Sequence, residues 1–150
     1  VERRAARGGV RRGEGAFFAG GSAYFCSTNG GPTERGQVYR LDIGVSGQND
    51  RLTLIAQADK EDVLDRPDNI TVAPWGDVFV AEDGKSPNGI FLIRPDGKAI
   101  QVARNAVNSG DSEVTGICFS PDGKWLFLNI QWEGLTVAVT GPFENLSTAV

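Results

Sequence analysis

The sequence contains no histidine and no methionine, and its only cysteines are Cys26 and Cys118. Without histidine, the chain supplies neither a Ser–His nor a Cys–His pair for nucleophilic catalysis. Each cysteine falls inside an apolar strand pattern, with no CxxC motif, so we expect two buried thiols rather than a disulfide. A zinc site of the His/Cys type is not expected, and a metal would be held mainly by oxygen ligands.

Long apolar runs and an excess of positive charge are also missing. No run approaches the ~20 residues that a membrane-spanning helix needs, and the formal net charge is −4. We therefore expect neither a membrane nor a nucleic-acid partner. There is no apolar signal-peptide core, and the start at Val1 indicates a processed or excised piece. The arginines near the start predict a basic, flexible, solvated segment over residues 1–13: Arg3, Arg4, Arg7, Arg11 and Arg12.

The sequence is instead rich in glycine, with 20 residues, and in short apolar segments separated by turn signals. β-Branched and aromatic residues within these segments favour strands, and Gly, Pro and Asp between them favour tight turns. A helical period is not evident, apart from one turn near residues 60–64. The predicted strands are 16–18, 23–27, 37–43, 52–58, 70–73, 78–81, 89–94, 99–104, 117–120, 125–130 and 135–140.

These strands fall into three successive sets that resemble one another. Without gaps, residues 24–27 (Tyr-Phe-Cys-Ser) fall on residues 78–81 (Val-Phe-Val-Ala), and the third set aligns through its Pro-Asp-Gly turn. Each set spans about fifty residues and about four strands, the size of a β-propeller blade, but the third lacks its fourth strand. We therefore expect an all-β fold over residues 14–150, a partial propeller of about two and a half to three four-stranded blades. Its open edges favour self-association.

The hairpin over residues 67–84 carries polar residues at both ends. Asp68 and Asn69 precede its first strand, and Glu82 and Asp83 follow its second, so both pairs lie at the end away from the turn. In a meandering blade, the loop that enters the first strand and the loop that leaves the second lie on one face, and this face is shared by neighbouring blades. We call it the mouth face. The residues expected there include Glu14, Asp68, Asn69, Glu82, Asp83, Glu113 and Asn129.

Several carboxylates on one face repel one another unless a cation lies between them. Oxygen ligands suit hard cations such as Ca²⁺ or Mg²⁺, and carboxylates also bind iron or manganese. From the pattern alone, a metal site and a set of solvated loop acids are equally open interpretations. The turn residues Asp77, Asp96 and Asp122 belong to the opposite face, where we expect them only to shape the turns.

Residues 67–77 (Pro-Asp-Asn-Ile-Thr-Val-Ala-Pro-Trp-Gly-Asp), followed by Glu-Asp-Gly at 82–84, resemble the PhoX-type alkaline phosphatase family of bacteria. So do residues 116–123 (Gly-Ile-Cys-Phe-Ser-Pro-Asp-Gly) with 126–131, the opening 14–18 and the closing 140–143. Together these motifs span nearly the whole chain. The resemblance implies the C-terminal portion of a six-bladed propeller. It also implies a mouth site that hydrolyses phosphate monoesters with Ca²⁺ and Fe³⁺.

In that family, acidic residues ligate a mixed iron–calcium cluster. The resemblance implies Glu14, Glu82 and Glu113 as metal ligands, with Asp68, Asn69, Asp83 and Asn129 as additional mouth residues. No catalytic residue is assigned.

The resemblance also implies a longer parent protein, periplasmic or secreted, whose cysteine ligand to iron lies before Glu14. This chain alone is therefore expected to be catalytically incomplete. Two alternatives stay open: a propeller fragment of a Ca²⁺-dependent hydrolase of the lactonase or strictosidine-synthase kind, and a non-catalytic propeller module used for packing or binding.

Overall fold

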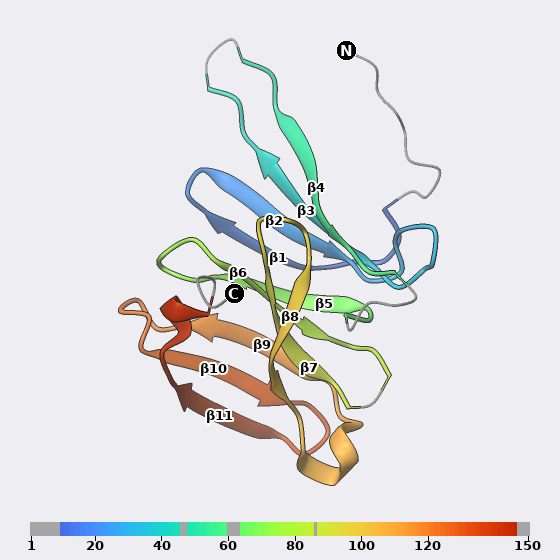
Figure 1. Ribbon diagram of the computed structural model, residues 1–150, viewed down its shortest axis with the longest axis vertical. Coiled ribbons are helices and arrows are strands. Elements are labelled where there is room, and N and C mark those ends of the chain that lie inside the picture. Colours follow the sequence, from blue (N-terminus) through green and yellow to red (C-terminus); the bar gives the residue numbers. More distant parts are fainter. Residues whose placement is uncertain (1–9, 46–47, 60–63, 86, 147–150) are drawn as a thin grey trace.

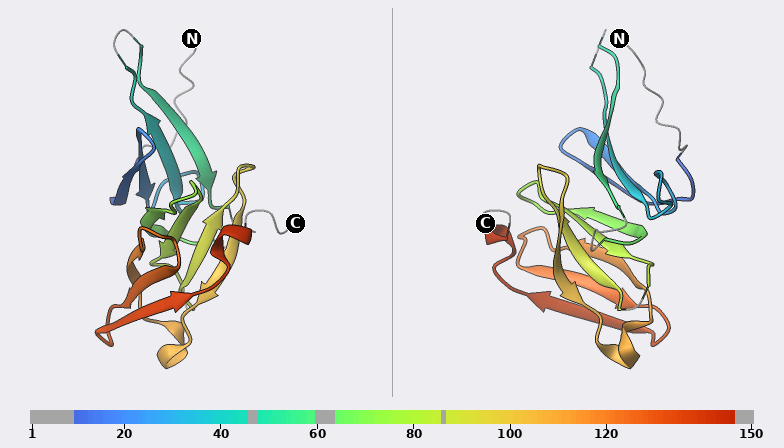
Figure 2. Two further views of the ribbon diagram at one scale, coloured as in Figure 1. Left: turned by 90° about the vertical axis from the view of Figure 1, so that its left-hand side faces the viewer. Right: turned by 45° about the vertical axis from the view of Figure 1, so that its right-hand side comes forward.

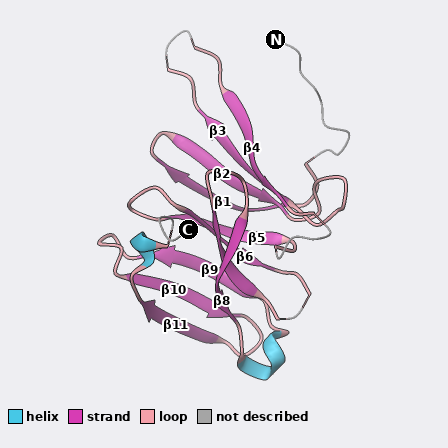
Figure 3. Ribbon diagram, in the orientation of Figure 1, coloured by secondary structure: helices cyan, strands magenta, loops and turns pink. Residues whose placement is uncertain are grey.

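The chain folds into three antiparallel β-sheets that follow one another along the sequence (Figure 1). The structure is a computed structural model, and it describes residues 10–45, 48–59, 64–85 and 87–146. Within these ranges there is no α-helix, and two short 3₁₀ segments, η1 (Val107–Gly110) and η2 (Phe143–Asn145), are the helical elements (Figure 3). None of the helices in the described ranges is long and apolar enough to cross a membrane.

Each sheet is a simple meander, which we call a blade. Blade 1 contains β1 (Gly13–Ala19), β2 (Ser22–Ser27), β3 (Gln37–Asp42) and β4 (Arg51–Gln57). Blade 2 contains β5 (Pro67–Val72), β6 (Val78–Glu82), β7 (Gly89–Ile93) and β8 (Ala99–Arg104). Blade 3 contains β9 (Val114–Phe119), β10 (Trp125–Ile130) and β11 (Leu135–Thr140).

All of the strands expected from the sequence are present, and within the described residues the third set forms a sheet of three strands. The all-β prediction is therefore correct, and the three open sheets agree with a propeller fragment. The expected turn near residue 60 lies mostly outside the described residues, as do residues 1–9 of the expected basic segment. Gly13, at the end of that segment, already belongs to β1.

Blade 2 lies between the other two blades (Figure 2). The first strands β1, β5 and β9 lie side by side, with β1 against β5 and β5 against β9. Strands β6 and β7 are buried along their whole length. This explains why both are almost continuously apolar, since a strand covered on both faces has no solvated side.

Alternate residues of β6 face the two neighbouring blades. Val78 and Val80 pack in a core with Cys26 and Val38 of blade 1. Phe79 and Ala81 pack instead in a second core, with residues of blade 3. The two interblade cores thus share one central sheet, and each is closed by a different side of that sheet.

The gapless alignment of the first two sets is wrong by one residue in the second strand. Ser27 pairs with Gly13 at the start of β1, and Glu82 pairs with Pro67 at the start of β5, so Ser27 corresponds to Glu82 rather than to Ala81. The reason is the longer turn between β5 and β6, which inserts a residue relative to the Gly20-Gly21 turn. Because side chains alternate along a strand, a slip of one residue exchanges the two faces.

Only one of the two cysteines is buried as predicted. Both are free thiols, as expected, and Cys26 is buried between blades 1 and 2, but Cys118 is exposed. Cys118 pairs with Phe127 on the side of blade 3 that no other described sheet covers. An apolar strand pattern predicts that a face is suited to burial, and in blade 3 that face has no neighbour in the described chain.

The turns opposite the mouth face have the structural role that their residues predict. Asp122 accepts hydrogen bonds from Ser120 Oγ (2.7 Å) and from the Lys124 amide (3.2 Å). Asp96 accepts one from the Lys98 amide (3.1 Å), and Asp77 accepts one from Trp75 Nε1 (2.7 Å). These carboxylates close their own turns, as short polar side chains commonly do.

Gly15 lies where the backbone of blade 1 comes into close contact with the backbone of blade 2. A Cβ atom added there would lie 2.6 Å from the Asp68 carbonyl oxygen and 2.8 Å from the Asn69 Cα, both of them backbone atoms of β5. Gly13, in the same strand, has no atom within 4 Å of its added Cβ. Only the first of these glycines is therefore required by packing.

We predict that Gly15→Ala lowers the free energy of unfolding by about 1–3 kcal/mol, because β1 must move away from β5. The matched control Gly13→Ala should leave it unchanged or raise it slightly. Urea denaturation of the two variants, compared by their midpoints at equal m-value, measures the difference. Equal midpoints for both variants would show that β1 and β5 are not in backbone contact.

Candidate functional site

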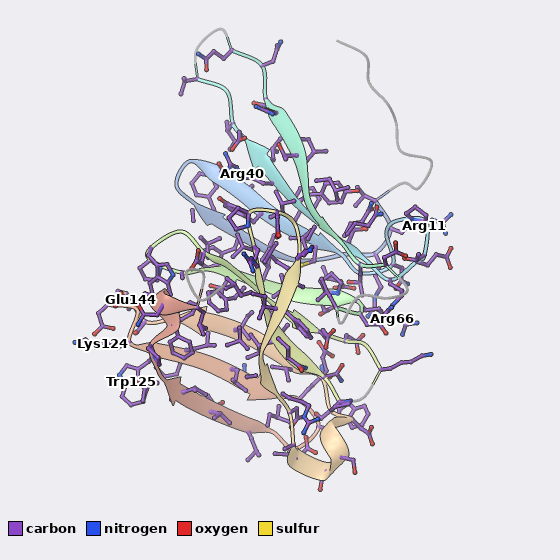
Figure 4. The ribbon with its side chains drawn as sticks, viewed as in Figure 1. Arg11, Arg40, Arg66, Lys124, Trp125 and Glu144 are labelled. Atoms are coloured by element: carbon purple, nitrogen blue, oxygen red, sulfur yellow. The ribbon has the colours of Figure 1, made fainter. Side chains whose placement is uncertain are left out.

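The mouth face lies where β1, β5 and β9 begin and where β2, β6 and β10 end. Figure 4 shows Arg11 and Arg66, which precede β1 and β5, on one side of the molecule. Lys124 and Trp125, at the turn between β9 and β10, lie on the other side. The structure therefore separates the two faces as the meander predicts.

Each blade reaches the mouth face through an irregularity in its strand pairing. The register shifts between Gly13 and Ala16 in blade 1, between Pro67 and Asn69 in blade 2, and between Phe127 and Asn129 in blade 3. Such bulges turn side chains away from the regular pleat and are common beside functional sites. Glu14 and Asp68 lie within the first two of them.

Interblade hydrogen bonds of two side chains, Thr28 and Asn69, hold the beginnings of the strands together. Thr28 Oγ1 of blade 1 lies 3.1 Å from the Pro67 carbonyl oxygen and 3.2 Å from Asp68 Oδ1. Asn69 Oδ1 accepts the Ile117 amide of blade 3 at 2.9 Å. Asn69 thus joins blades 2 and 3, which is a structural reason for an amide at this position.

Four of the expected mouth residues come together in the structure: Glu14, Asp68, Asp83 and Glu113. A hydrogen bond between the carboxyl groups of Glu113 and Asp68 raises the pKa of Glu113 and opposes the rise in the pKa of Asp68. Burial raises the pKa of Glu113 to about 7, and the negative charges of Asp68 and Asp83 contribute to the rise. Burial, followed by the charge of Glu14, also raises the pKa of Asp68. We call these four residues the acidic cluster.

Arg12 lies within the acidic cluster and was not recognised from the sequence. Its guanidinium contacts Glu14 Oε1 at 3.0 Å and Asp83 Oδ2 at 3.2 Å, and so connects blade 1 to blade 2. Its backbone has a φ of +53°, which is unusual for a residue with a side chain. Arg11 also has an acidic partner, Glu34 at 2.9 Å, but 65% of its side chain is exposed. The expected basic, flexible segment over residues 1–13 stays a prediction. The available signal was the position of Arg12 two residues before Glu14.

Glu82 lies apart from the acidic cluster in its contacts. It is buried, with 3% of its surface exposed. Its two carboxylate oxygens accept the amides of Asp65 (2.6 Å) and Gly89 (3.1 Å). Burial raises its pKa to about 8, against the effect of these two hydrogen bonds. Its contacts therefore give Glu82 a role in joining the loop before β5 to the start of β7, and its role as a metal ligand stays a prediction.

Asn129 also has partners within its own sheet. Its amide nitrogen lies 3.5 Å from the Thr115 carbonyl oxygen, and its Oδ1 accepts the Thr136 hydroxyl at 2.8 Å. In the described part of the chain, no three His, Cys, Asp or Glu side chains already form a group that could hold a metal ion. The acidic cluster therefore brings carboxylates close together without the geometry of a complete ligand set.

A second depression lies away from the acidic cluster, between blades 1 and 2 on the side of the turns. Its lining includes Arg40, Asp77, Arg94 and Asp96. Arg40 pairs with Asp42 at 2.6 Å, and Arg94 lies 4.0 Å from Asp96. In the acidic cluster, by contrast, four carboxylates surround one arginine, so the acidic cluster is the stronger candidate for a site that binds a cation.

Comparison with protein families finds one match that covers most of the chain. A family model described as alkaline phosphatase PhoX matches residues 2–134. This range includes all three blades up to the end of β10 and the whole acidic cluster. A comparison with curated proteins gives no match.

We predict that Glu82→Gln lowers the free energy of unfolding by about 1–3 kcal/mol at a pH above the Glu82 pKa of about 8, where Glu82 is a carboxylate. Urea denaturation with EDTA present measures the change. The new NH₂ group must face the amide of Asp65 or of Gly89, which leaves two donors opposed. The control Glu144→Gln removes an exposed carboxylate and should have little effect. An unchanged midpoint for Glu82→Gln, with weakened Ca²⁺ binding, would instead identify Glu82 as a ligand.

Proposed function

Because the chain belongs to the PhoX alkaline phosphatase family, we propose that its mouth face is part of a metal-dependent site for the hydrolysis of phosphate monoesters. The observation that supports this most directly is the convergence of Glu14, Asp68 and Glu113, one from each blade, beside Arg12. Carboxylates arranged in this way attract a cation, and a cation beside them attracts phosphate. The carboxylates of the site would thus bind the metal cation, and the Arg12 guanidinium would bind the phosphate.

The chemistry of the donors suits Ca²⁺ and Fe³⁺, the ions proposed for this site. Hard cations bind carboxylate oxygens, and the acidic cluster offers four carboxylates. Burial raises the pKa values of Asp68 and Glu113, and the charges of neighbouring carboxylates add to the rise. A bound cation would favour the ionised forms and so lower both pKa values. Glu14, Asp68 and Glu113 would hold the ions, and the described chain supplies them as part of a ligand set rather than the whole of it.

Bound metal ions in such a site neutralise the charge of the phosphate and stabilise the transition state of its transfer. The residues of the chain itself would then contribute by positioning the phosphate group of the substrate. Arg12 is held by Glu14 and Asp83, and 44% of its side chain is exposed at the mouth face. A guanidinium matches two oxygens of a phosphate group, so Arg12 is suited to orient the substrate.

We predict that the chain binds Ca²⁺ and that Glu113→Gln weakens this binding by roughly 10-fold or more. Isothermal titration calorimetry with CaCl₂ measures the affinity. Asp122→Asn is the matched control, because Asp122 is an acid on the opposite face and is bound only within its own turn. Equal Ca²⁺ affinity for both variants would show that the ion is not held by the acidic cluster.

We also predict that a longer protein carrying this sequence together with further blades hydrolyses p-nitrophenyl phosphate when Ca²⁺ and iron are supplied. Glu14→Ala should lower kcat/KM roughly 100-fold, through loss of a metal ligand. Arg12→Lys should raise KM more than it lowers kcat, because Lys keeps the charge but not the two-point contact. The exposed Glu144→Gln serves as the control. Lactone hydrolysis without phosphatase activity would favour the lactonase-like alternative.

A further inference from the structure

A pocket of about 280 Å³ lies on the mouth face, between blades 1 and 2. Three connections at this face form its walls: the loop between β2 and β3, the segment before β5, and the loop after β6. Both blades around the pocket belong to this chain. Its lining includes Asn29, Glu34, Arg35, Asp65, Arg66 and Lys85. We call it the rim pocket.

The rim pocket adjoins the acidic cluster. The Arg66 carbonyl oxygen accepts the amide of Asp83 at 3.0 Å. Arg66 precedes Asp68 by two residues, and Lys85 follows Asp83 by two residues. Because two residues of extended chain span at most about 7 Å, each of these cations belongs to the same stretch of backbone as a carboxylate of the cluster. A molecule of a few carbon atoms can therefore reach from one site to the other.

The two carboxylates that line the rim pocket already have cationic partners. Glu34 pairs with Arg11 at 2.9 Å, and Asp65 pairs with Arg35 at 3.2 Å. These acids are thus neutralised by other arginines, and neither is paired with Arg66 or Lys85.

Arg66 and Lys85 are the cations that remain in the rim pocket. In the described part of the chain, neither forms an ion pair with a carboxylate. Both residues are exposed, and Figure 4 shows Arg66 on the same side of the molecule as Arg11. Two unpaired cations in one depression attract an anion, and a guanidinium binds two oxygens of a phosphate or carboxylate at once.

The backbone fixes the position of Arg66. Its amide donates to the Arg35 carbonyl oxygen at 2.7 Å, and its carbonyl oxygen accepts the Asp83 amide at 3.0 Å. Its φ of +55° lies in the left-handed region, which is uncommon for a residue with a side chain. Since such a conformation persists only where the surroundings impose it, blade 1 and the end of β6 together hold Arg66 at the pocket.

Asn29 gives the rim pocket an acceptor for a hydroxyl group. Its Oδ1 atom is buried and has no hydrogen-bond partner among the described residues. Buried acceptors in folded proteins are normally paired, so an unpaired one in a pocket indicates a donor that comes from outside the chain. A hydroxyl group next to the anionic group of a ligand would supply this donor.

We propose that the rim pocket binds a second anionic group of the substrate, while the reacting phosphate lies at the acidic cluster. This inference rests on the proposed phosphatase function. The pocket is smaller than the roughly 300–1,000 Å³ of sites that enclose a whole ligand, so it accommodates one end of a molecule. The substrate class is then a phosphate monoester whose alcohol part carries a hydroxyl and a further anionic group, a few carbon atoms from the ester.

The first test compares two esters in a longer protein that carries this sequence with further blades. Glycerol 3-phosphate and 3-phosphoglycerate differ by a carboxylate in place of a CH₂OH group. We expect kcat/KM to be at least about tenfold higher for 3-phosphoglycerate, because its carboxylate contacts both cations. The double variant Arg66→Gln, Lys85→Gln should abolish this preference. The control Lys98→Gln, which removes an exposed cation at the opposite face, should retain it.

The second test measures binding without catalysis. Inorganic phosphate is added to the chain after metal ions have been removed on a chelating resin, and the amide signals are followed by ¹H–¹⁵N NMR. We expect shifts for the loop between β2 and β3 and for residues 83–85. The double variant should weaken phosphate binding at least about fivefold, and Lys98→Gln should leave it unchanged. The same spectra establish that each variant is folded.

The two tests separate this inference from the phosphatase function. Equal kcat/KM for the two esters, or a preference that the double variant keeps, would overturn the inference while the phosphatase function stands. Phosphate shifts confined to residues outside the rim pocket would also overturn it. Phosphate binding that the double variant removes, without hydrolysis of either ester, would support the rim pocket as an anion site and overturn the phosphatase function.

Discussion

The close passage of β1, β5 and β9 is the constraint on which the rest of the structure depends. Gly15 brings the backbone of β1 against that of β5, and Asn69 ties β5 to β9. Because these strands all begin at one end, the residues at their starts are brought together there. The acidic cluster is therefore assembled by apolar packing elsewhere in the blades, against the mutual repulsion of its own charges.

The electrostatics of the mouth face follow from this forced proximity. Glu113 is hydrogen-bonded to Asp68, and Arg12 neutralises part of the charge of Glu14 and Asp83. Both devices reduce the repulsion that packing imposes. A cation would do the same, which connects the geometry to the phosphatase family of the chain. The repulsion among the carboxylates and their expected attraction for a cation thus both follow from the packing of the three blades.

The sequence was sufficient for the strands and the order of the blades, because alternation, turn residues and repeats act locally. It was insufficient where the structure depends on a one-residue shift in strand register or on a partner that is distant in the sequence. The gapless alignment missed the longer turn between β5 and β6, and so exchanged the faces of β6. Cys118 has a buried residue's pattern on an uncovered face. Arg12 was grouped with a basic segment, since its partner Asp83 is distant in sequence.

At the mouth end of every blade, an irregularity in strand pairing separates candidate site residues from the regular part of the sheet. Glu14 and Asp68 lie within bulges, outside the regular ladders that carry the interblade cores. Exchanging such residues changes what the site binds while the apolar layers keep their contacts. A fold built in this way can acquire new reactions by divergence at a few positions, and it offers protein engineers a rim of replaceable side chains on an unchanged frame.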